Sequence, residues 1–176
     1  MLDLVSIPEE RKPVLIGANG GTKKKIEKLT KTRLLVREDV EIEGEPLDVL
    51  KSKEIVKAIG RGFSPEIALQ LAKDDIALFI TKISGTEKTI KRQLARVIGS
   101  HGKARKNIEF LTGTHISVYG KTVSVIGKYE DAENAKKSID SILSGSRHGY
   151  VYKHLESRVS KMNKAKILET ENSQNI

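Results

Sequence analysis

The pattern of apolar and polar positions predicts two sets of the same secondary-structure elements along the chain. Residues 2–7 and 76–83 are expected to form opening strands, with weak alternation in the first and apolar runs in the second. A short basic helix then leads to a glycine turn, and a second helix follows it. In that second helix apolar residues recur at the i, i+3 spacing of a buried stripe, as Ile26 with Leu29 and Ile108 with Leu111.

Two strands and a closing helix are predicted after each of these helices. The strands are expected at residues 32–37 and 40–44 in the first set, and at 114–119 and 122–127 in the second. The closing helices are expected at 47–59 and 131–143. Each unit therefore has the order strand, helix, loop, helix, strand, strand, helix, which predicts an α+β fold.

The two units are copies of each other. At an offset of 82, ten of the 21 positions from 16 to 36 are identical, where about one identity is expected by chance. The identical pairs are Ile16/Ile98, Gly17/Gly99, Gly20/Gly102, Lys24/Lys106, Ile26/Ile108, Glu27/Glu109, Leu29/Leu111, Thr30/Thr112, Thr32/Thr114 and Val36/Val118. The offset then becomes 83, so one extra residue lies in a loop of the second copy, which is a small perturbation.

The segments outside the repeat set the expected domain boundaries. We predict a first domain at residues 1–63, an inter-domain helix at 64–75, a second domain with a C-terminal helix at 76–160, and a disordered tail at 161–176. Ser64 is a natural N-cap, and Pro65 and Glu66 suit the first helical turn. The helix of the inter-domain segment has no counterpart of similar sequence in the second copy, where a further helix is expected from Tyr150 to about Ile167.

Composition narrows the class of protein. The 176 residues carry a formal net charge of +9, which suggests a polyanionic partner, although a highly soluble basic surface explains the charge equally well. No cysteine is present, which excludes disulfides, zinc ribbons and thiol nucleophiles. No stretch approaches the ~18 apolar residues of a bilayer span, and the N-terminus is too short and too acidic for a signal peptide. The expected compartment is the cytoplasm.

The glycine turn of each copy is the candidate site. Glycines let the backbone turn sharply and let a phosphate approach, and the following helix adds free N–H groups and its positive dipole end. Basic side chains one turn later suit a sugar–phosphate backbone. The candidate RNA-binding residues are Gly99, Ser100, His101, Gly102, Lys103, Arg105, Lys106, Arg92 and Arg96 in the second copy, and Gly17, Ala18, Asn19, Gly20, Lys23 and Lys24 in the first.

Plainer interpretations remain for several of these residues. A single Gly-x-x-Gly is usually a tight turn, and only its repetition inside matching units makes it a strong signal. The lysine run 23–25 also fits the solvated face of a helix. For His101, contact with a phosphate and simple exposure to solvent are equally good interpretations. We expect His148 and His154 to serve local packing, and Tyr150 and Tyr152 to dock on the second domain.

The same sequence shows no catalytic constellation. It has no nucleophile beside a base, no metal-ligand spacing and no Walker loop, so neither a metal nor another cofactor is expected and the chain is not expected to be an enzyme. Its few aromatic residues argue against an RRM or a single-strand-binding OB platform, which stack bases on rings.

The paired helices around the loop, followed by two strands and a helix, resemble the type I KH domain, whose loop clamps about four nucleotides. Longer segments resemble the archaeal relatives of the dimethyltransferase-interacting, partner-of-Nob pre-ribosomal KH family. These segments are residues 58–66, 96–105, 116–121 and 148–152, and the resemblance covers about residues 3–158. Eukaryotic members generally have a degenerate first loop, whereas this chain keeps both glycines there.

The resemblance implies binding to single-stranded RNA near the 3′ end of small-subunit rRNA during ribosome maturation. It also implies contact with the endonuclease and the rRNA dimethyltransferase that act there, and with the alpha subunit of translation initiation factor 2. Two other functions stay open: a KH-type RNA regulator or RNA-decay adaptor, and a protein-interaction scaffold in which one KH unit docks a translation or processing factor.

Overall fold

Each half of the chain folds into a three-stranded antiparallel sheet with helices on one face. The computed structural model describes the backbone of residues 1–174 and the side chains of residues 1–166. The first copy contains β1 (Leu2–Val5), η1 (Glu9–Arg11), α1 (Lys12–Ile16), η2 (Ala18–Gly20), α2 (Gly21–Thr30), β2 (Arg33–Val36), β3 (Val40–Glu43) and α3 (Pro46–Gly60). The short helices α4 (Pro65–Ala68) and η3 (Leu69–Ala72) follow it. The second copy contains β4 (Ile76–Lys82), α5 (Glu87–Ile98), η4 (Ser100–Gly102), α6 (Lys103–Thr112), β5 (His115–Tyr119), β6 (Thr122–Lys128) and α7 (Tyr129–Leu143), followed by α8 (His148–Gln174).

The two sheets have the same topology. Their strand orders are β1-β3-β2 and β4-β6-β5, so in each the last strand of the copy lies in the centre. Ile42 of β3 pairs with Leu34 of β2, and Val125 of β6 pairs in the same way with Ile116 of β5. The predicted α+β fold, with a three-stranded antiparallel sheet in each of two tandem units, is confirmed.

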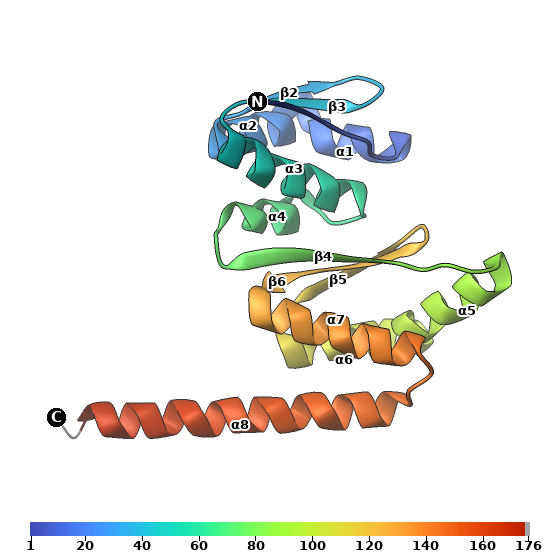
Figure 1. Ribbon diagram of the computed structural model, residues 1–176, viewed down its shortest axis with the longest axis vertical. Helices are drawn as coiled ribbons and strands as arrows, with labels where there is room; N and C mark the ends of the chain where they lie inside the picture. Colours follow the sequence, from blue (N-terminus) through green and yellow to red (C-terminus); the bar gives the residue numbers. More distant parts are fainter. Residues whose placement is uncertain (175–176) are drawn as a thin grey trace.

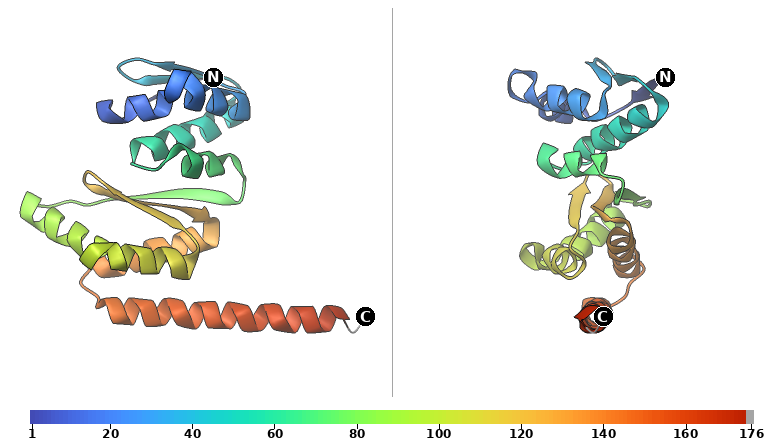
Figure 2. Two further views of the ribbon diagram at one scale, coloured as in Figure 1. Left: turned by 180° about the vertical axis from the view of Figure 1, so that it is seen from behind. Right: turned by 90° about the vertical axis from the view of Figure 1, so that its left-hand side faces the viewer.

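The layers of the two copies are stacked. The first sheet lies over α1, α2 and α3, and the second sheet lies below α3 and α4, with its own helices α5 to α7 beneath it and α8 below those (Figures 1 and 2). The second sheet is thus covered on both faces, and Ile126 of β6 belongs to the core of the first copy. The outer face of the first sheet has no such cover, since Leu2 and Leu4 are 63% and 58% exposed.

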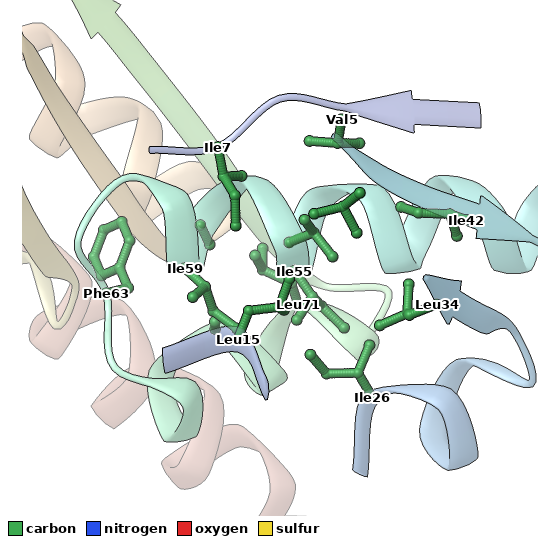
Figure 3. Packing of buried hydrophobic residues seen from close by; sticks show 14 of the residues in the cluster. Val5, Ile7, Leu15, Ile26, Leu34, Ile42, Ile55, Ile59, Phe63 and Leu71 are labelled. Carbon is green, nitrogen blue, oxygen red and sulfur yellow. The ribbon is translucent and has the colours of Figure 1, made fainter. Parts of the chain in front are cut away.

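Aliphatic side chains from every layer of the first copy form its core (Figure 3). Leu15, Ile26, Leu34 and Ile55 are fully buried. The segment predicted as an inter-domain helix forms α4 and η3, and it packs into this same core through Ala68 and Leu71. The segment therefore belongs to the first core.

The paired identities of the repeat form one polar network in each copy. The Glu27 carboxylate accepts a hydrogen bond from the Leu34 backbone N–H at 2.8 Å, and Glu109 accepts one from Ile116 at 2.7 Å. Two threonine hydroxyls pair beside each of them, Thr30 with Thr32 and Thr112 with Thr114, both at 2.8 Å. These bonds join the helix after the glycine loop to the next strand, so the duplicated residues fix the loop relative to the sheet.

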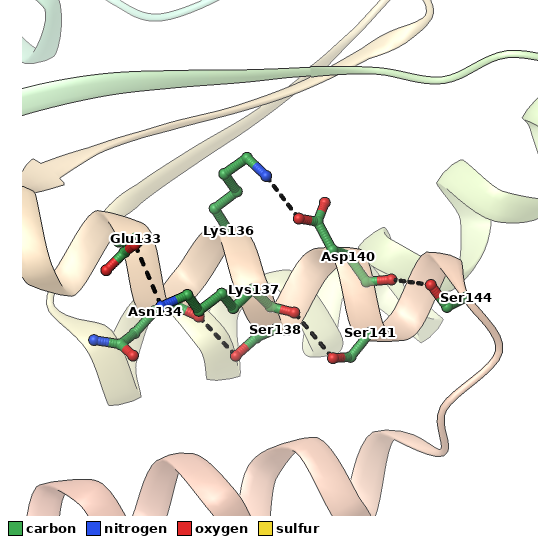
Figure 4. A network of polar contacts seen from close by, with 8 residues as sticks. All are labelled: Glu133, Asn134, Lys136, Lys137, Ser138, Asp140, Ser141 and Ser144. Atoms are coloured by element: carbon green, nitrogen blue, oxygen red, sulfur yellow. Dashed lines mark hydrogen bonds and ion pairs between the residues drawn. The ribbon is translucent and has the colours of Figure 1, made fainter.

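The charges of α7 are largely paired along the helix itself (Figure 4). Lys136 lies 2.7 Å from Asp140, and Lys137 lies 3.3 Å from Glu133, both at the i, i+4 spacing. The hydroxyl groups of Ser138, Ser141 and Ser144 donate to carbonyl oxygens four residues earlier. Lysines paired in this way are weaker candidates for phosphate contact than the cations near the glycine loops.

A single long helix ends the described chain. We expected a helix from residue 150 to about 167 and a disordered tail over 161–176, but α8 is one helix from His148 to Gln174, and residues 175–176 lie outside the described residues. Val151 and Leu155 of its first turns are buried in the second core. No glycine or proline follows Gly149, so no residue type there ends the helix. The domain boundaries stay predictions.

Candidate nucleic-acid interface

The two glycine loops have the same backbone conformation. In the second loop the φ angles of Gly99, His101 and Gly102 are 73°, 51° and 73°. In the first loop those of Gly17, Asn19 and Gly20 are 71°, 51° and 73°. All of these angles lie in the left-handed region, where glycine has no penalty and asparagine and histidine are more common than other residues. The sequence repeat is therefore a repeat of geometry at the candidate site.

The two glycines of each loop have different roles. A Cβ on Gly99 would lie 2.6 Å from the Ala104 Cβ and 2.7 Å from its backbone nitrogen, so the loop packs directly against the start of α6. A Cβ on Gly17 would meet Thr22 in the same way, at 2.3 Å from its Oγ1. Around Gly102, in contrast, only the Lys106 Cε comes within 4 Å, at 3.9 Å. The first glycine is required by packing, while the second leaves open space.

The cations after each loop lie at matching places. The Lys106 Cε lies 3.9 Å from the place that a Cβ on Gly102 would take. The Lys24 Cε lies at the same distance from the place of a Cβ on Gly20. Arg105 lies 4.0 Å from the Glu109 carboxylate, and Lys23 lies 3.9 Å from Glu27. These carboxylates also hold the next strand, so Arg105 and Lys23 are oriented by the fold. Lys103 is exposed at the first position of α6.

A groove of about 350 Å³ runs beside the second loop, between α6 and β5. Its walls come from both copies: Ile98, Gly102, Arg105, Ser117, Val118 and Tyr119 from the second, and Arg11 and Gly62 from the first. The loop, a cation of α6 and the half-buried strand β5 meet here.

Contacts between the copies hold the far wall of the groove. The Ser117 hydroxyl donates to the Arg61 carbonyl at 2.8 Å, and the Tyr119 hydroxyl donates to the Glu10 carboxylate. The Arg11 guanidinium lies 6.0 Å from the centroid of the Tyr119 ring, a cation–π geometry. A groove of the second copy is therefore completed by a cation of the first.

The hydrogen bond between Tyr119 and Glu10 shifts the pKa of each group in the direction that keeps the bond intact. The hydrogen bond from Tyr119 lowers the pKa of Glu10 below its ordinary value. The same bond, to an anionic acceptor, raises the pKa of Tyr119. At neutral pH the carboxylate is charged and the phenol is protonated.

The two arginines predicted before the second loop have different environments. The Arg96 guanidinium donates to the Ile142 carbonyl at 2.8 Å and to the Ser146 carbonyl at 2.7 Å. Its own carbonyl lies 2.7 Å from Nε2 of His148, which confirms the expected local role of that histidine. Arg92 is exposed. The fold thus gives Arg96 partners of its own, and Arg92 is the freer of the two for a phosphate contact.

Six wall residues of the groove were missed by sequence reasoning, among them Arg11, Ser117 and Tyr119. Tyr119 and Ser117 lie in the segment 116–121, which carried the family resemblance and could have marked them. The pattern of apolar residues predicted only a strand there and assigned neither residue to the site. Arg11 had no signal, because its place at the groove depends on how the two copies pack. Of the two tyrosines expected to dock on the second domain, Tyr152 packs against that core, whereas Tyr150 is 71% exposed.

Within the described part of the chain, no group of three or more metal-ligating side chains comes together. In that same part no helix combines the length and the apolar character needed to cross a bilayer.

A three-stranded antiparallel sheet, helices on one face and a Gly-x-x-Gly loop between two of them define a KH domain of type I. Residues 76–160 match the family model of the eukaryotic type KH-domain (KH-domain type I). A KH domain-containing protein of Methanocaldococcus jannaschii is 41% identical over 176 residues, which cover 94% of this chain and 78% of that protein.

Solved structures agree with this class. Dim2p from Pyrococcus horikoshii has a TM-score of 0.81 at 42% identity, covering 89% of this chain and 99% of that one. A protein of unknown function from Aeropyrum pernix has a TM-score of 0.89 at 32% identity, covering 98% of both chains. The Dim2p chain in a complex of a/eIF2alpha, aDim2p and rRNA from Pyrococcus horikoshii has a TM-score of 0.83 at 41% identity, covering 92% and 95%. The chain belongs to the Dim2 family of KH-domain proteins, the partner-of-Nob homologues.

Proposed function

We propose that this protein is an RNA-binding ribosome-assembly factor that holds single-stranded RNA near the 3′ end of small-subunit rRNA through its Gly-x-x-Gly loops. The observation that carries the proposal is the groove beside the second loop. It joins an open glycine turn, the Arg105 side chain and the half-buried strand β5 in one cleft of about 350 Å³. Membership of the Dim2 family supports the choice of rRNA, since the Pyrococcus relative forms a crystalline complex that contains rRNA.

The two sides of the groove suit the two parts of a nucleotide. The open space at Gly102 lets a phosphate approach the free N–H groups at the start of α6, where the helix dipole also favours negative charge. Lys103, Arg105 and Lys106 supply the positive charge around that place. The strand wall at Ser117 and Val118 is left for the bases. The phosphate contacts fix position, and contacts along the strand supply whatever base preference exists.

The second copy is expected to dominate RNA binding. Its loop is followed at once by Lys103, whereas the first loop is followed by Gly21 and Thr22 before any lysine. Its groove also gains Arg11 from the first copy. The outer face of the first sheet exposes Leu2 and Leu4, which favours a second role for the first copy as a docking surface for a protein.

Partners and chemistry follow from the same proposal. The a/eIF2alpha subunit in the Pyrococcus complex supports initiation factor 2 alpha as a partner of this chain. The rRNA dimethyltransferase and the 3′-end endonuclease are proposed from the family resemblance alone. The protein is expected to position RNA for such enzymes rather than to catalyse a reaction, and a ribosome-assembly role fits the expected cytoplasmic location.

Crosslinking in cells, followed by sequencing of all bound RNA, tests this function. Most crosslinks should fall in one region at the 3′ end of small-subunit rRNA. Crosslinks spread over many transcripts would instead support the RNA-regulator hypothesis. RNA recovery no better than that of a chain with aspartates at Ser100 and His101 would support the scaffold hypothesis.

A further inference from the structure

A second cavity borders the second glycine loop on the side opposite the groove. Its volume is about 270 Å³, and its lining residues are Gly99, Ser100, Lys103, Ala104, His148 and Tyr152. Gly102 borders the groove, while Gly99 and Ser100 border this cavity. The loop therefore borders two clefts, and an RNA bound at the groove can extend past the loop into the second cleft.

The first two turns of α8 shape the second cavity. The Nε2 of His148 lies 2.7 Å from the Arg96 carbonyl, and the carbonyl can only accept, so the ring is anchored as a donor. The Tyr152 ring lies with its centroid 6.1 Å from that of His148, and it packs against the second core. Burial raises the pKa of the Tyr152 phenol, which stays protonated at neutral pH. A fixed aromatic ring, two hydroxyls and the exposed Lys103 thus meet beside the loop.

The first copy provides an internal comparison. The positions that correspond to the loop residues of this cavity, at the offset of 82, are Gly17, Ala18, Gly21 and Thr22. The cation and the serine hydroxyl are replaced there, by Gly21 and Ala18. The shared fold does not require these groups, since the first loop keeps its conformation without them. Lys103 and Ser100 are therefore explained better by a ligand than by packing, whereas the His148 and Tyr152 rings also pack within the second copy.

We propose that this cavity binds one further nucleotide of the RNA that lies on the second loop, with its base stacked on Tyr152 and its phosphate beside Lys103. The proposal rests on the RNA-binding function above and extends the same site. Aromatic rings bind bases through stacking that tolerates any sequence, so the added nucleotide contributes affinity rather than base specificity. The complete RNA-binding site is then longer than the groove alone.

Binding of short RNAs to the full-length protein tests this proposal. The probes are a tetranucleotide from the 3′ end of small-subunit rRNA and two hexanucleotides that extend it at the 5′ or the 3′ end. One hexanucleotide should bind the wild-type protein about tenfold more tightly than the tetranucleotide, which is ~1.4 kcal/mol. Tyr152→Leu, which removes the aromatic ring and keeps an apolar side chain, should remove that gain and leave tetranucleotide binding unchanged. Tyr152→Phe should keep the gain.

Tyr150→Leu is the matched control, because Tyr150 lies on the same helix two residues away, is exposed and does not line the cavity. It should bind all three probes as the wild type does. A second, variant-free measurement uses 4-thiouridine at the added positions: a photo-crosslink to Tyr152 is expected from one of them.

The outcomes separate the two proposals. If the wild-type protein binds none of the three RNAs, the RNA-binding function itself is wrong. If it binds the tetranucleotide but neither extension strengthens binding or crosslinks to Tyr152, the cavity is not a nucleotide site while the function stands. Equal losses for all probes in Tyr152→Leu would show that the ring only supports the loop. If that variant does not fold, the crosslink in the wild-type protein decides.

Discussion

Arg11 and Arg96 donate to equivalent backbone carbonyls in the two copies, although the repeat does not align the two arginines. Arg11 donates to the carbonyls of Ile59 and Phe63, each at 2.7 Å. Arg96 donates to those of Ile142 and Ser146, which lie 83 residues further along. The two arginines themselves differ by 85 positions, three more than the repeat offset in that region. Arg11, at the end of η1, and Arg96, in the last turn of α5, each tie the segment before the glycine loop to the end of the last helix of its copy.

This relationship predicts that Arg96 matters for stability more than for direct RNA contact. Arg96→Ala leaves two carbonyls without their charged donor, and hydrogen bonds to charged groups contribute roughly 1.5–3 kcal/mol each when intact and partly buried. We expect a loss of about 2 kcal/mol in the free energy of unfolding, measured with urea. Arg92→Ala, at an exposed site, should change stability by less than about 0.5 kcal/mol and should weaken RNA binding. The reverse pattern would contradict these roles.

The two glycines of the second loop should respond differently to alanine. Gly99→Ala places a Cβ against the backbone of Ala104, at 2.7 Å from its nitrogen, and overpacking of this kind costs about 1–3 kcal/mol in addition to the strain of positive φ. Gly102→Ala has only the strain, roughly 1–2 kcal/mol, but its Cβ enters the space proposed for the phosphate. For Gly102→Ala we therefore expect a larger loss in the free energy of RNA binding than in the free energy of unfolding.

Gly113→Ala is the control for this pair. Its φ is +65° and no atom lies within 4 Å of the added Cβ, so it measures the strain of positive φ at a helix end away from the loop. Thermal unfolding should place Gly102→Ala near Gly113→Ala and Gly99→Ala below both. Equal stability of Gly99→Ala and Gly113→Ala would refute the packing role of the first glycine.

The contact between Tyr119 and Glu10 predicts a pH dependence of stability. The pKa of Glu10 is lowered in the folded protein, so the contact stabilises the fold above the ordinary pKa of about 4.5 and is lost as pH falls through the folded value. Tyr119→Phe removes the donor. The melting temperatures of wild type and variant should differ at pH 7 and converge as the pH falls through the lowered pKa of Glu10. Other carboxylates with lowered pKa values, such as Asp3 and Asp74, affect both proteins alike.

The salt dependence of RNA binding checks the phosphate contacts as a group. If one domain neutralises ~4 phosphates, the slope of about −0.7 per contact for single strands predicts a roughly fifty-fold loss of affinity between 50 and 200 mM salt. The measurement is a binding titration of one single-stranded oligonucleotide at several salt concentrations. A flat response would contradict phosphate clamping, and tighter binding to duplex RNA would contradict the KH assignment.

The sequence predicted the elements that a local pattern determines. The duplication at offset 82 located both loops, and the structure gives them one conformation down to the positive φ of Asn19 and His101. Groups that depend on packing between the copies were not predictable in this way. Arg11 reaches the groove because the second sheet lies against the first copy, and no spacing along the chain encodes that contact.

The same limit applies to the C-terminal helix. The polar composition of residues 169–176 predicted a disordered end, because the last residues of a chain are often poorly ordered. The buried Val151 and Leu155 hold its first turns, and the rest continues as helix through residues that favour it. The role of Tyr152 beside the loop depends on where those first turns lie, which the sequence did not show.

The variable positions of the second loop give the most direct test of the site. Ser100 and His101 are exposed and lie in the middle of the turn, and His101 has a φ of 51°, a conformation that aspartate tolerates well. Replacing both with aspartate should change stability by less than about 0.5 kcal/mol and leave the melting temperature nearly unchanged. Two carboxylates would then face the incoming phosphate, and a net penalty of ~1.4 kcal/mol already weakens binding tenfold.

At least a tenfold loss of RNA affinity is therefore expected for Ser100→Asp with His101→Asp, measured by titration of the full-length protein. The matched control is Ala18→Asp with Asn19→Asp in the first loop, which has the same backbone conformation but no cation at Gly21. It should lose less. Full-length variants suit this comparison better than isolated domains, because separating the copies would expose Ile126 and Leu78, which pack on the first core. Normal RNA binding by the folded second-loop variant would make the loop structural and favour the scaffold hypothesis.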